Sequence, residues 1–390
     1  MLFTSSEYAE RLANVRRRME AQGLSSLLVT DPANLNYLTG YNAWSFYTPQ
    51  VLFVPLTGDL LFFLRAMDAQ GAFRTAWLPP GNMIGYPESF VHRPHLHPFD
   101  WVADALRARG LVEPNRVGLE MDSQFFSPKA YRALETGLPE WTFVDAVELV
   151  NWVRVIKTDA EIAQMRLAAR VAESAMTAAV EHVRVGVRQC DAAAAISQAQ
   201  IAGTPEIGGD YTAIVPMLPT GVEADTPHLT WNDQPFEDGQ AVIVELAGAH
   251  HRYHVPMART IVLGQPSDQL ARLADAINDG LSSVLDLVRP GVGTRDLAEA
   301  WNVTLARYGL EKPSRIGYSI GLAYPPDWGE RTVSLRGEDD TVLQENMTFH
   351  LIGGMWMENF GCELSESIRV TATGVETFTS FPRRLLTSHS

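Results

Sequence analysis

A histidine and several glutamates in the second half of the chain have the chemistry expected of catalytic groups. His228 lies in a polar segment, and an unperturbed imidazole titrates near pH ~6.5, so it can take and return a proton at neutral pH. Glu245 lies in the apolar run 241–247, where a carboxylate is desolvated unless it is paired. Such a group can act as a nucleophile, a proton carrier or the counter-charge of a cationic substrate. A structural ion pair with Arg259 is the alternative.

Two further glutamates, Glu363 and Glu366, are predicted to be catalytic. They are three residues apart in the strand-like run 363–369. Residues three apart on a regular strand point to opposite faces, so both reach one cavity only if the strand bulges. For either side chain the alternative is exposure on the surface.

Aromatic and basic side chains from three segments are predicted to bind the substrate. The predicted residues are Tyr41, Trp44, Phe46, Tyr47, Tyr253, His254, Tyr318, Trp328 and Arg331. The first four lie in a polar loop, where exposed rings are costly unless they pack on something, and packing against their own domain is the alternative. Arg331 is suited to a bidentate contact with a substrate carboxylate. The glycine-rich segment 317–331 lacks the Lys-Ser/Thr ending of a phosphate-binding loop.

The elements that must position these residues form two domains. In the first half, the periodicity predicts a helix over 8–22 and buried strands over 26–30, 51–54 and 60–64, which together indicate an α/β domain.

A boundary is predicted where this pattern stops. Thr158 and Glu161 have the spacing of a capping box and indicate that a new helix begins there. Strand-like and helical segments alternate again from residue 241 through residue 369. We therefore expect one domain over 1–152 and a second, catalytic domain over 153–390.

Residues 243–260 resemble a strand pair of the pita-bread superfamily, which includes methionine aminopeptidase, prolidase, aminopeptidase P and creatinase. Its peptidases carry a run of the form D-x-G-A-(x)3-G-Y-x-S-D-x-T-R-T, in which both aspartates bind a dinuclear metal centre. Here Glu245 stands at the first position and Pro256 at the second. A proline side chain has no donor atom for a metal.

The other three ligand positions of that family are also changed. Tyr318 stands in the place of the ligand histidine, Ile352 in that of one glutamate and Ser365 in that of the other. Hard divalent cations need several carboxylates or imidazoles at one point, and a single carboxylate does not make a site. We therefore predict no metal and no other cofactor. Glu363 replaces an arginine of the family pattern, a change of charge sign that fits a cationic group in the substrate.

The resemblance implies an α/β creatinase-like N-terminal domain and an α+β pita-bread C-terminal domain, in a homodimer. His228 matches a histidine that creatinase uses as its acid–base group. The family places the loop over 39–49 above an active site, often that of the partner subunit. Further segments resemble a branch of the superfamily that opens a cyclic amidine in compatible-solute degradation; they are 38–47, 214–221, 227–231, 252–260, 324–331 and 381–386.

These observations predict a metal-independent hydrolase that acts on a small cyclic amidine bearing a carboxylate. A protonated amidine carbon is already electrophilic, whereas a peptide carbonyl needs the Lewis acidity of a metal. Three alternatives stay open: a creatinase-type amidinohydrolase, a prolidase-type dipeptidase and a non-catalytic binding protein of the same fold. The dipeptidase needs ligands that this chain lacks.

Composition restricts the partners. The net charge of −15, from 46 acidic and 31 basic residues, argues against nucleic acid and anionic membranes. Two cysteines without CxxC spacing favour a reducing compartment, and the N-terminus shows no apolar signal-peptide core. We therefore expect a cytoplasmic enzyme with a small-molecule substrate, with no nucleic acid and no membrane as partner.

Overall fold

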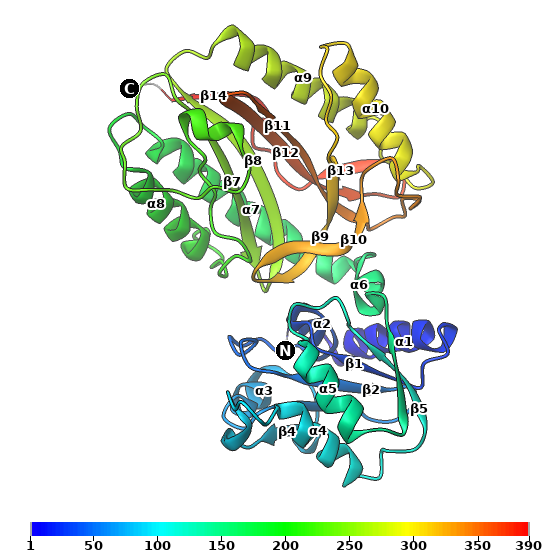
Figure 1. Cartoon of the computed structure of the whole chain (residues 1–390). Coiled ribbons are helices and arrows are strands. Elements are labelled where there is room, and N and C mark those ends of the chain that lie inside the picture. The colour runs from blue at the N-terminus through cyan, green and yellow to red at the C-terminus, as the bar shows by residue number, and fades with distance from the viewer. Residues whose placement is uncertain (1, 389–390) are drawn as a thin grey trace. The chain divides into compact units, whose positions relative to one another are not determined.

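Two packed units make up the chain, Met1–Arg154 and Val155–Ser390 (Figure 1). A computed structural model describes residues 2–388. Within that range no helix is both long and apolar enough to cross a bilayer.

The first unit is built on a six-stranded mixed sheet with the order β4-β3-β2-β1-β5-β6. Its strands are β1 Ser26–Val29, β2 Val51–Pro55, β3 Leu61–Arg65, β4 Met83–Tyr86, β5 Asn115–Leu119 and β6 Trp141–Asp145. The pair β1–β2 and the pair β2–β3 are antiparallel, whereas β5 runs parallel to both β1 and β6. The strands predicted over 26–30, 51–54 and 60–64 are therefore confirmed, with shifts of a residue at their ends.

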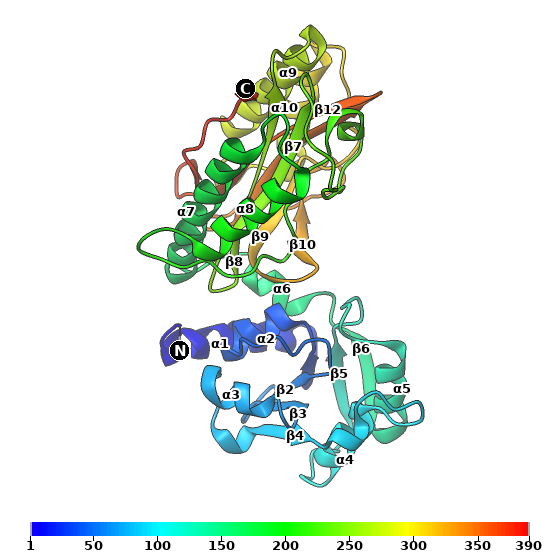
Figure 2. The ribbon, with the colours of Figure 1, turned by 90° about the vertical axis from the view of Figure 1, so that its left-hand side faces the viewer.

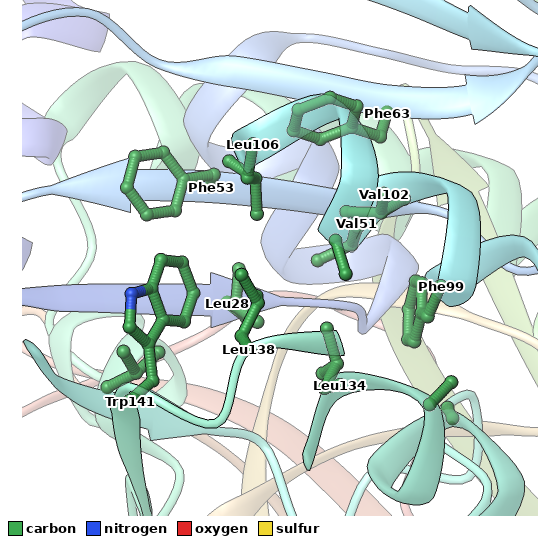
Figure 3. Packing of buried hydrophobic residues seen from close by; sticks show 14 of the residues in the cluster. Leu28, Val51, Phe53, Phe63, Phe99, Val102, Leu106, Leu134, Leu138 and Trp141 are labelled. Carbon is green, nitrogen blue, oxygen red and sulfur yellow. The ribbon is translucent and has the colours of Figure 1, made fainter. Parts of the chain in front are cut away.

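Helices cover this sheet. They are α1 Ser5–Ala21, α2 Pro32–Thr39, α3 Ala69–Thr75, α4 Pro98–Arg107, α5 Pro128–Gly137 and α6 Leu149–Arg154. The helix predicted over 8–22 corresponds to α1. Figure 3 shows the core between the sheet and two of the helices, where Phe99 and Leu106 of α4 and Leu134 of α5 pack with the strand residues Phe53 and Phe63.

The second unit contains an eight-stranded sheet with the order β13-β12-β11-β9-β8-β14, with β10 paired to β9 and β7 paired to β8. The strands are β7 Ala241–His250, β8 Tyr253–Leu263, β9 Gly317–Tyr324, β10 Asp327–Ser334, β11 Thr348–Met357, β12 Phe360–Val370, β13 Val375–Thr377 and β14 Leu386–Ser388. Its helices are α7 Asp159–His182, α8 Gln189–Ala202, α9 Asp268–Leu285 and α10 Thr294–Ala306.

The predicted capping box opens α7. The Thr158 hydroxyl accepts from the Glu161 N–H at 3.3 Å, and the Glu161 carboxylate accepts from the Thr158 N–H at 3.0 Å. Two N–H groups at the start of the helix are thereby satisfied. The helix that begins the second unit is thus specified locally.

The helices pack on one face of this sheet, which leaves the other face for a site. Helices α7 and α8 lie along β7, and α9 lies on β11 and β12 (Figures 1 and 2). Val244 and Leu246 of β7 belong to the core formed with α7 and α8. A Cβ on Gly353 of β11 would meet Ile277 of α9 at 2.5 Å. Side chains alternate along a strand, so the residues between these positions point away from the helices, onto what we call the site face.

Candidate active site

The five positions that correspond to metal ligands in the pita-bread frame lie on the site face. Glu245 lies between Val244 and Leu246, which face the helices. The remaining four are assigned by the same alternation and by strand register; they are Pro256, Tyr318, Ile352 and Ser365. The fold therefore keeps the geometry of the frame and changes its side chains.

These side chains do not fit a dinuclear metal centre. The Ser365 hydroxyl accepts from the Ala258 N–H at 2.7 Å, and the neighbouring Ser367 hydroxyl donates to the Pro256 carbonyl at 2.7 Å. Both hydroxyls thus tie β12 to β8. Within residues 2–388, no group of three or more His, Cys, Asp or Glu side chains is placed to hold a metal ion.

A pair of buried carboxyl groups, Glu245 and Glu363, occupies the site face. Their side chains belong to residues that are 6% and 4% exposed. Burial raises the pKa of Glu245 well above its usual range, and the charge of Glu363 adds to the rise. Burial raises the pKa of Glu363 to about 7. Because the charge of Glu363 acts on Glu245, the two groups do not ionise independently.

Lys312 accompanies Glu363 and was missed by sequence reasoning. Its Nζ donates to the Gly354 carbonyl at 2.9 Å, and Gly354 stands directly opposite Glu363 in the β11–β12 register. Burial lowers the pKa of Lys312 to about 8, and the Lys312 ammonium in turn opposes the rise in the pKa of Glu363. A single lysine that precedes β9 in the sequence gives no indication that it interacts with a residue on β12.

A chain of three hydrogen-bonding side chains crosses the same face. The Trp328 indole N–H donates to the Tyr318 hydroxyl at 2.7 Å, and that hydroxyl lies 2.9 Å from Nδ1 of His350. Burial lowers the pKa of His350 to about 3, and the charges of Arg259 and Arg315 add to the effect. His350 was also missed, although it stands two residues before Ile352 and therefore on the same face of β11.

Glu366 lies outside this group, so its predicted catalytic role is corrected. The β11–β12 pairing runs without a shift from Thr348–Arg369 to Met357–Phe360, so the bulge that would bring Glu366 to the site face is missing. Glu366 instead pairs with Arg259 at 3.2 Å. Arg259 also donates to the Pro382 carbonyl at 2.7 Å and has a structural role. The alternative partner considered for it, Glu245, faces the other way.

Tyr253 and His254 were predicted to bind substrate, and their contacts indicate structural roles instead. The Tyr253 hydroxyl donates to Glu161 at 2.9 Å. Nε2 of His254 accepts from the Ala213 N–H at 2.9 Å, so its proton lies on Nδ1, which donates to the Arg252 carbonyl at 2.8 Å. Tyr253 is 1% and His254 0% exposed. We do not retain either residue in the candidate site.

His228 lies in an exposed loop. Backbone hydrogen bonds connect this loop to Glu245 through the segment that contains Met217 and Leu218. The Leu229 carbonyl accepts from the Leu218 N–H at 3.1 Å, and the adjacent Met217 N–H donates to the Glu245 carbonyl at 2.9 Å. The backbone of His228 has a φ of 68°, a left-handed conformation that is uncommon for a residue with a Cβ. Such conformations cluster at functional sites.

Two of the four rings in the aromatic loop pack against their own unit, and the other two are exposed. The Tyr41 ring packs edge-on against Phe62 at 5.1 Å and its hydroxyl lies 2.6 Å from Ser45, while the Phe46 ring lies 5.9 Å from that of Phe125. The remaining rings, Trp44 and Tyr47, are each 58% exposed. Packing against its own domain, the alternative considered for this loop, therefore describes Tyr41 and Phe46. Arg331 is exposed on β10.

Comparisons with known proteins identify the class. Residues 163–372 match the model of metallopeptidase family M24, and residues 11–156 match the creatinase/prolidase N-terminal domain. The chain belongs to family M24, with an N-terminal creatinase-like domain and a pita-bread C-terminal domain, as the sequence predicted.

Particular relatives differ in how closely they resemble the chain. An ectoine hydrolase from Halomonas elongata is 44% identical, over 98% of each chain. An Xaa-Pro dipeptidase from Lactobacillus delbrueckii is 23% identical, over 96% of this chain and 98% of its own. A solved prolidase from Thermococcus sibiricus superimposes with a TM-score of 0.84 at 17% identity, covering 98% of this chain and 100% of its own. The last of these shows a shared fold.

Proposed function

We propose that the chain hydrolyses the amidine of ectoine and opens its ring to N-acetyl-2,4-diaminobutyrate. The observation that carries this proposal is the buried pair Glu245–Glu363, on a face whose other metal-ligand positions hold non-ligating side chains. Ectoine is a cyclic amidine with a carboxylate, and its amidinium supplies the positive charge that two buried carboxyls need. The 44% identity with an ectoine hydrolase supports the same substrate.

In the proposed reaction, both carboxyls meet the amidinium. Glu245 gives up its proton to solvent through His228 when the cation arrives, because an opposite charge favours the ionised form. Glu245 then steers a water to the amidinium carbon, or attacks that carbon itself, in which case the water afterwards adds to the same carbon and the bond to Glu245 breaks. The water oxygen becomes the amide oxygen, one C–N bond breaks, and both water protons end on the leaving nitrogen, giving an ammonium group. Glu363 stabilises the cation and carries a proton to that nitrogen, and His228 exchanges protons with solvent.

This chemistry requires no metal. The carbon of a protonated amidine is electrophilic before the enzyme acts, whereas a peptide carbonyl relies on Lewis acidity. The changed side chains at Pro256, Tyr318, Ile352 and Ser365 support metal independence. Each of them lacks the carboxylate or imidazole that hard divalent cations prefer.

We further propose that the enzyme is a cytoplasmic homodimer in which the loop of Tyr41 to Tyr47 helps to enclose the substrate. The exposed rings of Trp44 and Tyr47 are the members able to face an amidinium. Trp328 and Arg331 stay in the proposal as neighbours of the substrate. Cys190 and Cys362 are free thiols, which fits a reducing compartment.

One experiment separates the candidate functions. Purified protein is incubated with ectoine, creatine and an Xaa-Pro dipeptide, each with and without a chelator. Ring opening of ectoine that survives the chelator is the expected result. Chelator-sensitive cleavage of the dipeptide would show a prolidase, turnover of creatine an amidinohydrolase, and binding of ectoine without turnover a non-catalytic protein.

A further inference from the structure

His350 presents a buried proton donor whose tautomer is fixed by its neighbours. The indole N–H of Trp328 can only donate, so the Tyr318 hydroxyl accepts at 2.7 Å. Trp328 and His350 are the two partners that this hydroxyl has within residues 2–388. The hydroxyl proton therefore goes to Nδ1 of His350 at 2.9 Å. A neutral imidazole has a single N–H, so the proton of His350 lies on Nε2.

This Nε2–H group has no hydrogen-bond partner in the described part of the chain, although His350 is 0% exposed. Buried donors in folded proteins are nearly always paired, and leaving one unpaired is costly. The three side chains thus orient a donor at a position where residues 2–388 supply no acceptor. A ligand that brings an acceptor would satisfy it.

Charged groups of both signs act on the site face. Glu245 and Glu363 are acidic, and Asp327 adds to the rise in the pKa of Glu245. The Arg315 guanidinium lies 4.4 Å from the centre of the Tyr318 ring, and its charge acts on His350. The two carboxyls suit a cation, whereas the unpaired N–H of His350 suits an acceptor such as a carboxylate.

We propose that His350 binds the carboxylate of the substrate through its Nε2–H group, oriented by Trp328 and Tyr318. This inference rests on the proposed function and deepens it: the substrate class is a zwitterionic ring, with its amidinium at Glu245 and Glu363 and its carboxylate at His350. A neutral imidazole suits this role, because it donates to the carboxylate without adding a charge that would compete with the amidinium for the glutamates. Cyclic amidines without a carboxylate are then poor substrates.

The test compares two substrates, ectoine and the same 2-methyl-tetrahydropyrimidine ring without its carboxylate. Wild-type enzyme should prefer ectoine in kcat/KM by roughly 10- to 100-fold, the range for one charge-assisted hydrogen bond. His350→Leu should lose that preference. Its kcat/KM for ectoine should fall by about the same factor, mainly through KM, while turnover of the ring without carboxylate stays unchanged.

Two further variants keep the test decisive. His350→Gln places an amide N–H near the position of Nε2 and should restore part of the preference. Tyr318→Phe removes the group that fixes the imidazole and should reduce the preference without abolishing it. Thermal unfolding shows which variants are folded, and if His350→Leu is not, the comparison rests on the other two.

Each outcome has a separate meaning. An equal loss for both substrates in His350→Leu overturns the carboxylate role and leaves the proposed function standing. A wild-type enzyme that opens both rings equally well also overturns it. If wild-type enzyme opens neither ring, the proposed function fails and this inference fails with it.

Discussion

Replacing Lys312 by methionine should move the acid limb of the pH–rate profile to higher pH. The Lys312 ammonium donates to the carbonyl of Gly354, the residue opposite Glu363, and it opposes the rise that burial causes in the pKa of Glu363. Methionine keeps an unbranched apolar stem of similar length and removes the charge. The substitution therefore acts on the carboxyl pair through electrostatics, with little change in packing.

The size of the effect follows from the pKa of Glu363, which is about 7 with the lysine present. Loss of a nearby opposite charge raises a carboxyl pKa by about 1 unit or more. At pH ~7 the ionised fraction then falls from about one half to about one tenth, so kcat/KM should fall about fivefold. The loss should disappear near pH ~9, where the carboxyl is ionised in both proteins.

The assay is kcat/KM for ectoine from pH ~6 to pH ~9.5, because kcat/KM reports the free enzyme. Lys312→Arg keeps the charge and should keep the wild-type acid limb. An acid limb in Lys312→Met at the wild-type pH, or a loss of equal size at every pH, would refute the electrostatic role of Lys312.

Four further predictions concern single side chains. Glu245→Gln and His228→Ala should each lower kcat by about 100-fold or more in folded protein, and a variant that keeps most of its turnover removes that residue from the mechanism. Glu366→Ala should cost roughly 3 kcal/mol of stability, because it leaves a buried guanidinium without its carboxylate, while kcat/KM of the folded protein stays near wild type. Glu363→Gln should show the reverse pattern, with a fall in kcat/KM and a gain in stability. The fold raises the pKa of Glu363 from 4.5 to about 7, so its carboxyl increasingly destabilises the wild type as pH rises through that interval. Urea unfolding should find Glu363→Gln more stable than wild type above pH ~7, with the advantage gone below pH ~4.5. Trp44→Ala should raise KM for ectoine more than it lowers kcat, and an unchanged KM would exclude the loop from substrate binding.

Local sequence signals account for the elements of this fold. The apolar run 241–247 predicts a buried strand and appears as part of β7, and the pair Thr158–Glu161 predicts the start of α7. Both signals act over a few residues, so they can be read without knowing the tertiary structure. Glu245 was identified for the same reason, since a carboxylate in such a run is conspicuous.

The choice between Glu363 and Glu366 required the strand register. Both are acidic, both are buried, and they stand three apart on one strand. Only the uninterrupted pairing of β11 with β12 shows that they face opposite sides, and only the position of Arg259 shows which one has a structural partner. A single-residue bulge between them would have turned one of the two side chains to the other face of the sheet. No local sequence signal shows whether such a bulge forms.

The missed residues share one property: their partners are distant in sequence. His350 depends on Tyr318, 32 positions away, and Lys312 contacts Gly354, 42 positions away. A lone histidine on an apolar strand or a lone lysine before one is usually structural, and only a tertiary contact gives it another meaning. Substitutions in a known frame show which chemistry was lost, whereas the groups that replace it must be found in the folded chain.

The charges of Glu245, Glu363 and Lys312 argue for the kind of substrate. Two carboxylates and the Lys312 ammonium leave one negative charge when all three groups are ionised, and a singly charged amidinium neutralises it. A neutral peptide bond would leave two buried carboxylates with only the Lys312 ammonium to balance them, which burial strongly disfavours. It would also find no Lewis acid among Pro256, Tyr318, Ile352 and Ser365. The loss of the metal ligands and the presence of a carboxyl pair that binds a cation therefore favour the same reaction, opening of an activated C–N bond in a small ring that carries an amidinium.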